Sequence, residues 1–308
     1  MTNKETRTSE LQATIADIKY TLHLLRQNPL VVIGSGIAIF FILLALVANL
    51  IVNPAVANQF NFSRSYLWNN PIISWGPLAR TGGPPAQPLG TDGYGRDLLQ
   101  MMILAIPLDL RTAFIIVAGA ALFGIILGAI ASYAGGIIDE AVLRVTDIFF
   151  AFPSLVLALV FAALFGRTLD TLTLAVLFVW WPPYVRLIRG QVLAEKEKTY
   201  VEALRAMGAG HLRILFRHIL PNSIYPLIVQ ITLDIGGVIL TFSALMFLGF
   251  SPTPAIPELG NLASDGITHV FDAPWLILFP GLTIVLISLA FNLVGDGLRD
   301  VLDPRLRR

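Results

Sequence analysis

The residue types that carry out chemistry in enzymes are sparse in this chain, and none of them forms a catalytic set. It contains no cysteine, which excludes disulfides, thiolate metal ligands and a cysteine nucleophile. The four histidines, His23, His211, His218 and His269, are too scattered to indicate a metal centre. No Gly-Lys dipeptide occurs, so a Walker A phosphate loop is absent. A membrane-bound enzyme therefore has no support in the residues.

The most strongly patterned polar segment is KTYVEALRAMGAGHLRILFRHILPN, residues 198–222. Thr199 and Glu202 have the spacing of a capping box, which predicts a short helix that begins at the next residue after Thr199. Gly208 and Gly210 are expected to end this helix after about two turns. One stripe of it would carry the apolar residues Tyr200, Ala203, Leu204 and Met207.

A second amphipathic helix is expected directly after these glycines. Its apolar side would consist of Leu212, Leu215, Phe216, Ile219 and Leu220. Two short helices separated by glycine form a knob rather than a simple connection. Local physics leaves two interpretations open. Either the glutamate only caps a helix and the arginines bind lipid phosphates, or the apolar stripe docks on a soluble partner.

Three aspartates lie in or beside apolar segments, where a charge is costly and therefore a functional candidate. Asp147 is expected about 9 Å into one segment, and Arg144, three residues earlier, is expected to pair with it. Asp234 lies near the middle of another segment. All three aspartates, together with Pro153, are candidates for the translocation path. Asp109 is expected at the outer mouth, in contact with solvent. Pro153 is a hinge candidate because proline kinks helices.

The composition sets the fold class in which these residues lie. Apolar residues make up 56% of the 308, charged residues 13%, and the mean hydropathy is +0.74, which together indicate an all-α, multi-pass membrane protein. A helix needs about 20 apolar residues to cross the hydrocarbon core. Six segments meet this length, at about 29–52, 108–132, 141–165, 170–190, 224–248 and 274–296.

Basic residues predict the orientation of these spans. With the N-terminus inside, sixteen of the 21 Lys and Arg residues lie on the cytoplasmic side and five lie outside. The positive-inside rule therefore predicts six spans with both termini in the cytoplasm. The net charge of +1 offers no argument for a nucleic-acid partner.

Two segments are expected outside the spans. Residues 1–28 form a cytoplasmic tail, within which apolar residues recur every three or four positions. This pattern predicts an amphipathic helix on the inner membrane surface, although a short coiled coil also fits. Residues 53–107 form a long, proline-rich outer loop, and residues 29–308 together form the transmembrane domain.

The segment EALRAMG, followed nine residues later by HILP, resembles the EAA loop of bacterial ABC-importer permeases. Leu204 stands in place of the second alanine and His218 in place of an isoleucine. Four further blocks resemble the dipeptide/oligopeptide/nickel permease family and indicate its C-type subunit. They are PLGTDGYGRDLL (88–99), YAGGIIDEAVLRVTDIFFAFPSLVLAL (133–159), LGFSPTPAIPELGNLASDG (248–266) and FNLVGDGLRDVLDPRLR (291–307). The resemblance covers residues 10–308.

This resemblance implies a fold like that of type I ABC importers, in a bacterial or archaeal inner membrane. It implies a B-type sister permease, two ATPase subunits that bind ATP and Mg, and an extracytoplasmic binding protein as partners, with no cofactor in this chain. The loop 191–223 would carry the coupling helix that contacts one ATPase. The implied coupling residues are Tyr200, Glu202, Ala203, Leu204, Arg205, Ala206, Met207, Gly208 and Ala209.

The substrate implied by the family is a di- or oligopeptide, with glycopeptides and nickel chelates also open. The sequence departs from the family at the outer mouth, where about 55–86 is extended and LAIPLDLR replaces a stretch like Y-G-A-R-x-S. The alternative function is a proton-coupled secondary transporter with Asp147 and Asp234 as its relay. That alternative requires internal repeats and leaves the knob unexplained.

Overall fold

The structure is a computed structural model that describes residues 26–60, 88–253 and 256–302. The expected helix within residues 1–28 and much of the outer loop 53–107 lie outside these ranges. Every long element in the described part is a helix. In chain order these are α2 (Pro29–Ile51), α3 (Pro54–Ala57), α4 (Leu98–Ala134), α5 (Gly136–Phe150), α6 (Ser154–Phe165), α7 (Leu169–Trp180), α8 (Pro182–Lys196), α9 (Thr199–Ala206), α10 (His211–Ile214), η2 (Leu215–Ile219), α11 (Leu220–Asn222), α12 (Tyr225–Leu245), η3 (Met246–Phe250), α13 (Leu259–Asp265), η4 (Ile267–His269) and α14 (Trp275–Leu302).

Five helical stretches are long and apolar enough to cross a membrane, and a bent pair supplies a sixth. The predicted all-α, multi-pass class is therefore confirmed, with five spans, or six if the bent pair crosses the membrane as one span. The second span begins earlier than predicted, at Leu98, because the Asp97 carboxylate caps α4 by accepting a hydrogen bond from the Gln100 N–H. The third span bends by 88° between α5 and α6. Proline disfavours a helical conformation in the residue before it, so Pro153 explains this bend.

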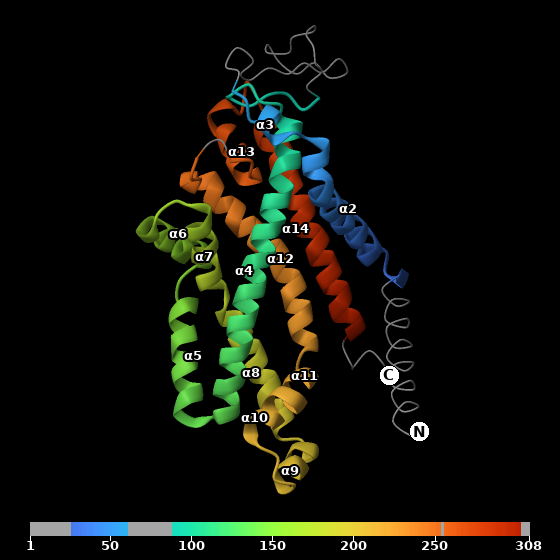
Figure 1. Cartoon of the computed structure of the whole chain (residues 1–308), viewed down its shortest axis with the longest axis vertical. Coiled ribbons are helices and arrows are strands. Elements are labelled where there is room, and N and C mark those ends of the chain that lie inside the picture. Colours follow the sequence, from blue (N-terminus) through green and yellow to red (C-terminus); the bar gives the residue numbers. More distant parts are fainter. Residues whose placement is uncertain (1–25, 61–87, 254–255, 303–308) are drawn as a thin grey trace.

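Figure 1 shows how the helices are arranged around α4, which runs the length of the molecule. Helix α2 packs against α4 on one side, α14 packs in turn against α2 and α12, and α5 and α6 lie on the other side of α4. Helix α9 projects at one end of the bundle, and α13 lies at the opposite end. The two ends are called below the α9 end and the α13 end.

Two glycines allow α4 and α8 to approach closely. A Cβ on Gly124 would lie 2.6 Å from the Trp181 carbonyl oxygen, and one on Gly128 would lie 2.9 Å from the Val185 carbonyl oxygen. The two positions form a G-x-x-x-G pattern, which permits close helix packing in membranes. This G-x-x-x-G signal is visible in the sequence and is an additional indicator of the α4–α8 contact.

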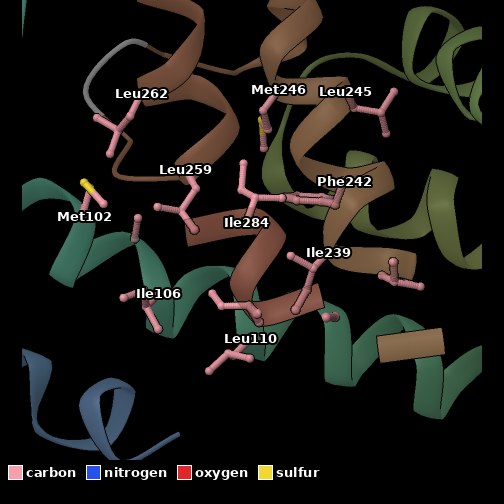
Figure 2. Packing of buried hydrophobic residues seen from close by; sticks show 14 of the residues in the cluster. Met102, Ile106, Leu110, Ile239, Phe242, Leu245, Met246, Leu259, Leu262 and Ile284 are labelled. Carbon is pink, nitrogen blue, oxygen red and sulfur yellow. The ribbon is translucent and has the colours of Figure 1, made fainter. Parts of the chain in front are cut away.

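At the α13 end, helix α13 inserts apolar side chains between three longer helices. Figure 2 shows Leu259 and Leu262 of α13 among buried residues of α4, α12 and α14. The shared cluster includes Met102 of α4, Phe242 of α12 and Ile284 of α14. Helix α13 is therefore part of the core and not a loose surface segment.

The glycine-rich stretch at 90–95 forms a turn that seats the start of α4. Asp92 accepts hydrogen bonds from the N–H groups of Tyr94 and Arg96, and its carboxylate also pairs with the Arg96 guanidinium at 2.6 Å. The Trp275 indole donates to the Thr91 carbonyl oxygen at 3.2 Å. Since the Asp92 side chain satisfies the N–H groups of Tyr94 and Arg96, and the Asp265 carboxylate satisfies that of Gly93, the stretch is built as a structural turn.

Candidate functional site

The clearest candidate site is helix α9, which stands at the end of the bundle. It begins at Thr199, with Lys198 as the N-cap residue, and it has no side-chain cap hydrogen bond. The predicted capping box between Thr199 and Glu202 is therefore wrong, although the helix itself lies within one residue of its expected start. Because Glu202 is exposed and caps nothing, its side chain is free for a contact outside the chain.

Helix α9 ends in a Schellman motif, as the glycines predicted. Gly208 has φ +79°, its N–H donates to the Arg205 carbonyl oxygen, and the Ala209 N–H donates to the Leu204 carbonyl oxygen. This pair of reverse bonds satisfies carbonyl groups at the helix end and requires a left-handed residue at position 208. Gly210, by contrast, has φ −65° and needs no glycine for its conformation.

A single buried residue and one polar network attach α9 to the rest of the protein. Val201 has no exposed surface, whereas Met207 is 75% exposed. The Tyr200 hydroxyl donates to a carboxylate oxygen of Glu195 at 2.8 Å, and the Lys198 ammonium pairs with the other oxygen. Partial burial raises the pKa of the Tyr200 hydroxyl, and the Glu195 carboxylate raises it further, so the hydroxyl remains a donor at neutral pH. Neither Val201 nor Glu195 was predicted from the sequence as a residue of this site.

The second helix of the knob buries a different set of residues from the predicted apolar face. Leu212 is 70% exposed and Phe216 is 42% exposed, whereas Ile214, Leu215 and Ile219 are buried. The π-helical stretch Leu215–Ile219 rotates the residues within and after it relative to a regular α-helix, which explains the outward position of Phe216. Leu212 precedes this stretch, in α10, where Ile214 takes the buried side instead. The predicted apolar face is therefore correct at Leu215 and Ile219 and wrong at Leu212 and Phe216.

A basic hollow lies between α9 and this second helix. It has a volume of about 390 Å³ and is lined by Leu204, Met207, Gly208, Ala209, Arg213, Arg217 and His218. Within the described ranges, neither Arg213 nor Arg217 forms an ion pair with a carboxylate. The hollow combines an apolar rim with unpaired positive charge, so it would accept an apolar group flanked by carboxylates.

Helix α8 connects this knob firmly to the membrane-spanning helices. Arg189 of α8 forms two parallel hydrogen bonds of 2.8 Å with the Asp139 carboxylate of α5, a geometry that fixes orientation as well as distance. Near the end of α8, the Lys196 ammonium donates to the Tyr133 carbonyl oxygen of α4 at 2.8 Å. Helix α8, which leads into α9, is therefore joined to both α5 and α4.

Asp147 forms its ion pair with a partner that the sequence analysis did not identify. The Arg186 guanidinium lies 2.5 Å from the Asp147 carboxylate and 4.1 Å from the centre of the Phe150 ring. Arg144 instead pairs with Glu140, one turn earlier on the same helix. The expected Arg144–Asp147 pair is therefore wrong. About half of each side chain in the Asp147–Arg186 pair is exposed.

An aromatic hollow of about 260 Å³ lies at the bend beside this ion pair. Its lining residues are Phe149, Phe150, Phe152, Ser154, Val179, Trp180, Pro182 and Pro183. Pro153 lies at the bend itself, between α5 and α6, and the break between α7 and α8 at Trp181 contributes to the same hollow. Two interruptions of helical structure thus meet at one place.

The remaining two aspartates are buried. Asp234 is 8% exposed, and the Gln230 side chain donates to it at 2.9 Å. Asp109 is 2% exposed, so the expectation that it contacts solvent is wrong. The start of α13 covers it, and this contact across 150 residues was invisible in the sequence. No group of three or more His, Asp or Glu side chains that could hold a metal occurs within 26–60, 88–253 and 256–302.

Comparison with known proteins places this geometry in a family. Residues 120–308, which include the broken spans and the knob, match the model of the binding-protein-dependent transport system inner membrane component. The chain belongs to this family. It is also 42% identical over 286 residues to the dipeptide transport system permease protein DppC of Escherichia coli K12, covering 93% of this chain and 92% of that protein.

Two other relatives cover the chain to a similar extent. The dipeptide transport system permease protein DppC of Alkalihalophilus pseudofirmus is 40% identical, covering 92% of this chain and 88% of the relative. The glutathione transport system permease protein GsiD of Pectobacterium atrosepticum is 35% identical, covering 92% and 89%. The chain is therefore a multi-pass inner-membrane permease component of an ABC transporter. It is not catalytic, it needs no cofactor of its own, and the ATPase resides in partner subunits.

Proposed function

We propose that this permease forms half of the translocation pore of an ABC importer for di- or oligopeptides. The relatives named for dipeptide and glutathione transport support this substrate class. The observation that carries the proposal is the exposed helix α9, held on α8 by Val201 and Glu195 in a chain without a phosphate loop. Such a helix is suited to transmit the movement of an ATPase subunit, driven by ATP hydrolysis, to this permease.

In this proposal, α9 docks on one of two ATPase subunits that bind ATP and Mg. The basic residues Arg205, Arg213 and Arg217 lie on the knob, so the α9 end is assigned to the cytoplasm by the positive-inside rule, as are both termini. The α13 end then faces the extracytoplasmic binding protein. A homologous B-type permease completes the pore.

The coupling movement follows from the rigid and interrupted parts of the fold. Helix α8 carries α9 at one end and is joined to α5 by the Asp139–Arg189 pair. Helix α5 ends at the aromatic hollow and α8 begins there. At this place the chain changes direction by 88° between α5 and α6. We propose that ATP-driven closure of the ATPases moves α9, α8 and α5 together and that the bend at Pro153 takes up the movement.

The Asp147–Arg186 pair is proposed to face the translocation path. Charged groups in membrane segments almost always face a protein interior or a water-filled cavity, because exposure to lipid is costly. About half of each side chain in this pair is left exposed by the rest of this chain. In the proposal, this exposed half faces the pore that the assembled transporter encloses. Asp234 is already covered by its own chain, and we propose for it a role at the edge of the path, beside Trp180 and Gly237.

Arg186→Ala is expected to lower ATP-dependent uptake at least about tenfold, because Asp147 would be left as an uncompensated charge. The matched control is Arg144→Ala, which removes the exposed Arg144–Glu140 pair within α5. Such an exposed pair contributes at most about 1 kcal/mol. Uptake by both variants is measured in proteoliposomes that contain the complete transporter. Equal uptake by the two variants would contradict a role of the Asp147–Arg186 pair in the path.

The proposed function is tested by the energy source of peptide uptake. Vesicles with the complete transporter and its binding protein should take up peptide when ATP is supplied inside, and an uncoupler should leave this uptake intact. Uptake that persists without ATP and is abolished by the uncoupler would indicate the proton-coupled alternative. Identification of the ligand on the binding protein distinguishes dipeptides from longer peptides and from glutathione.

A further inference from the structure

Two buried carboxyl groups from distant parts of the chain meet where α13 is seated. Asp109 belongs to α4 and is 2% exposed, and Glu258 is the N-cap residue of α13 and is fully buried. The Leu259 N–H, the first of α13, donates to one oxygen of Asp109 at 3.3 Å. Leu259 directly follows Glu258 in the chain, so this hydrogen bond brings the two carboxyl groups to the same junction. They therefore form one buried acidic pair at the junction of α4 and α13.

The hydrogen bonds of this pair are incomplete in a specific way. Both oxygens of Glu258 are occupied, since the Ser243 hydroxyl donates to one at 2.8 Å and the Asn261 N–H donates to the other at 2.6 Å. Oxygen Oδ1 of Asp109 is buried and has no hydrogen-bond partner within the described residues. A buried acceptor without a donor is unfavourable. A proton on the pair would supply the missing donor.

Among the described residues, the side chains around the pair provide no compensating cation. On α13 and η4 the titratable groups are Asp265 and His269, and neither is among the groups that act on Glu258 or Asp109. Asp265 is engaged by the Gly93 N–H at 2.7 Å. On α12 and η3 the polar group that faces Glu258 is the Ser243 hydroxyl. The pair thus lies among neutral groups.

Among the residues that the structure describes, the basic residues of this end are directed elsewhere. Arg96 is paired with Asp92, Arg167 lies over the Phe250 ring, and Arg111 is exposed.

We propose that Asp109 and Glu258 form a buried proton-binding site that holds α13 against α4 and α12. One proton shared by the two carboxyl groups removes the repulsion between them and provides the donor that Asp109 lacks. The seat of α13 is tight, because a Cβ on Gly260 would lie 2.0 Å from the Ser243 carbonyl oxygen. Loss of the proton would place two negative charges in this seat and displace α13.

The direction and range of the pH dependence follow from the environment of Glu258. Burial is the main cause that raises the pKa of its carboxyl, to about 7 from the ordinary value of 4.5. A raised pKa means that the docked state of α13 binds the proton more tightly than the undocked state. Docking is therefore strongest below about pH 4.5 and weakens until about pH 7. Over this range the docking equilibrium is expected to fall by up to about 300-fold.

The absence of cysteine from the chain permits a direct test. Ala263→Cys places a thiol on the buried side of α13, where the native residue is 4% exposed, and Val270→Cys provides a reference thiol at an exposed position of the same loop. The complete transporter in membrane vesicles is treated with a hydrophilic maleimide between pH 4.5 and 8. The ratio of the two labelling rates corrects for the reactivity of the thiol itself. This ratio should rise steeply up to about pH 7.

Two isosteric variants separate the proton from a general effect of pH. Glu258→Gln and Asp109→Asn each replace the proton with an amide N–H donor, so the ratio should stay low and independent of pH. The control Glu140→Gln removes an exposed carboxyl group and should keep the wild-type profile. A flat wild-type profile, or rapid labelling of both amide variants at every pH, would overturn the proposal. Protection by sodium but not choline at pH 8 would overturn it in favour of a cation site.

Discussion

Gly208→Val is expected to uncouple ATP hydrolysis from peptide uptake while leaving the membrane helices inserted. Position 208 has φ +79°, and a β-branched side chain strongly disfavours this conformation, by about 1–3 kcal/mol. The Schellman bonds that end α9 would be lost, and the exposed helix would change its direction relative to α8. Uptake should fall at least about tenfold while ATP hydrolysis continues. Both rates are measured on the same reconstituted transporter.

The matched control is Gly210→Val, two residues further along the chain. Gly210 has φ −65°, and a Cβ there meets no atom within 4 Å, so the same substitution should leave uptake close to the wild-type rate. Glu202→Lys should behave like Gly208→Val, because it reverses the charge of an exposed residue on the docking helix without removing a cap. Wild-type uptake by Gly208→Val would exclude the proposed coupling role of α9.

Gly128→Leu is expected to prevent assembly of the permease into a stable transporter. A Cβ at this position would lie 2.6 Å from the Ile188 side chain and 2.9 Å from the Val185 backbone, and backbone atoms cannot move aside as a flexible side chain can. Helices α4 and α8 would separate, and overpacking of this kind typically costs about 1–3 kcal/mol or more. The amount of intact complex is measured by size-exclusion chromatography after gentle solubilisation, and it should fall sharply.

Gly36→Leu in α2 serves as the control for this substitution. It is the same change in another membrane-spanning helix, at a position where a Cβ meets no atom within 4 Å. The control should assemble at the wild-type level. If both variants assemble equally well, the close contact between α4 and α8 is not required for the fold.

Features that depend on local sequence were predictable. The six apolar segments, the two-helix knob and its glycine termini follow from composition, hydrophobic spacing and the backbone freedom of glycine. Gly208 is the clearest example, since the pattern predicted the end of a helix there and the structure has a left-handed residue. For the role of the knob, local physics left two interpretations open, and only the motif resemblance favoured docking on an ATPase.

Features that depend on contacts between distant segments were not predictable. Asp147 pairs with Arg186 across 39 residues, whereas the sequence favoured Arg144 because it is close along the helix. Asp109 was expected in solvent, but α13 covers it. In both cases the sequence identifies a carboxylate in or beside an apolar segment. Its partner and its burial are set by tertiary packing, which helical spacing does not encode.

In the proposed mechanism, α9 contacts an ATPase on another chain and transmits its movement to this permease. A photoreactive thiol reagent on Met207→Cys tests it most directly, because the chain has no other cysteine and the native side chain is 75% exposed. In the purified complex, illumination should crosslink Met207→Cys to an ATPase subunit. Leu240→Cys, at a position 53% exposed on spanning helix α12, should not crosslink to it. A transport-competent complex in which Met207→Cys reacts only with lipid or solvent would contradict the claim.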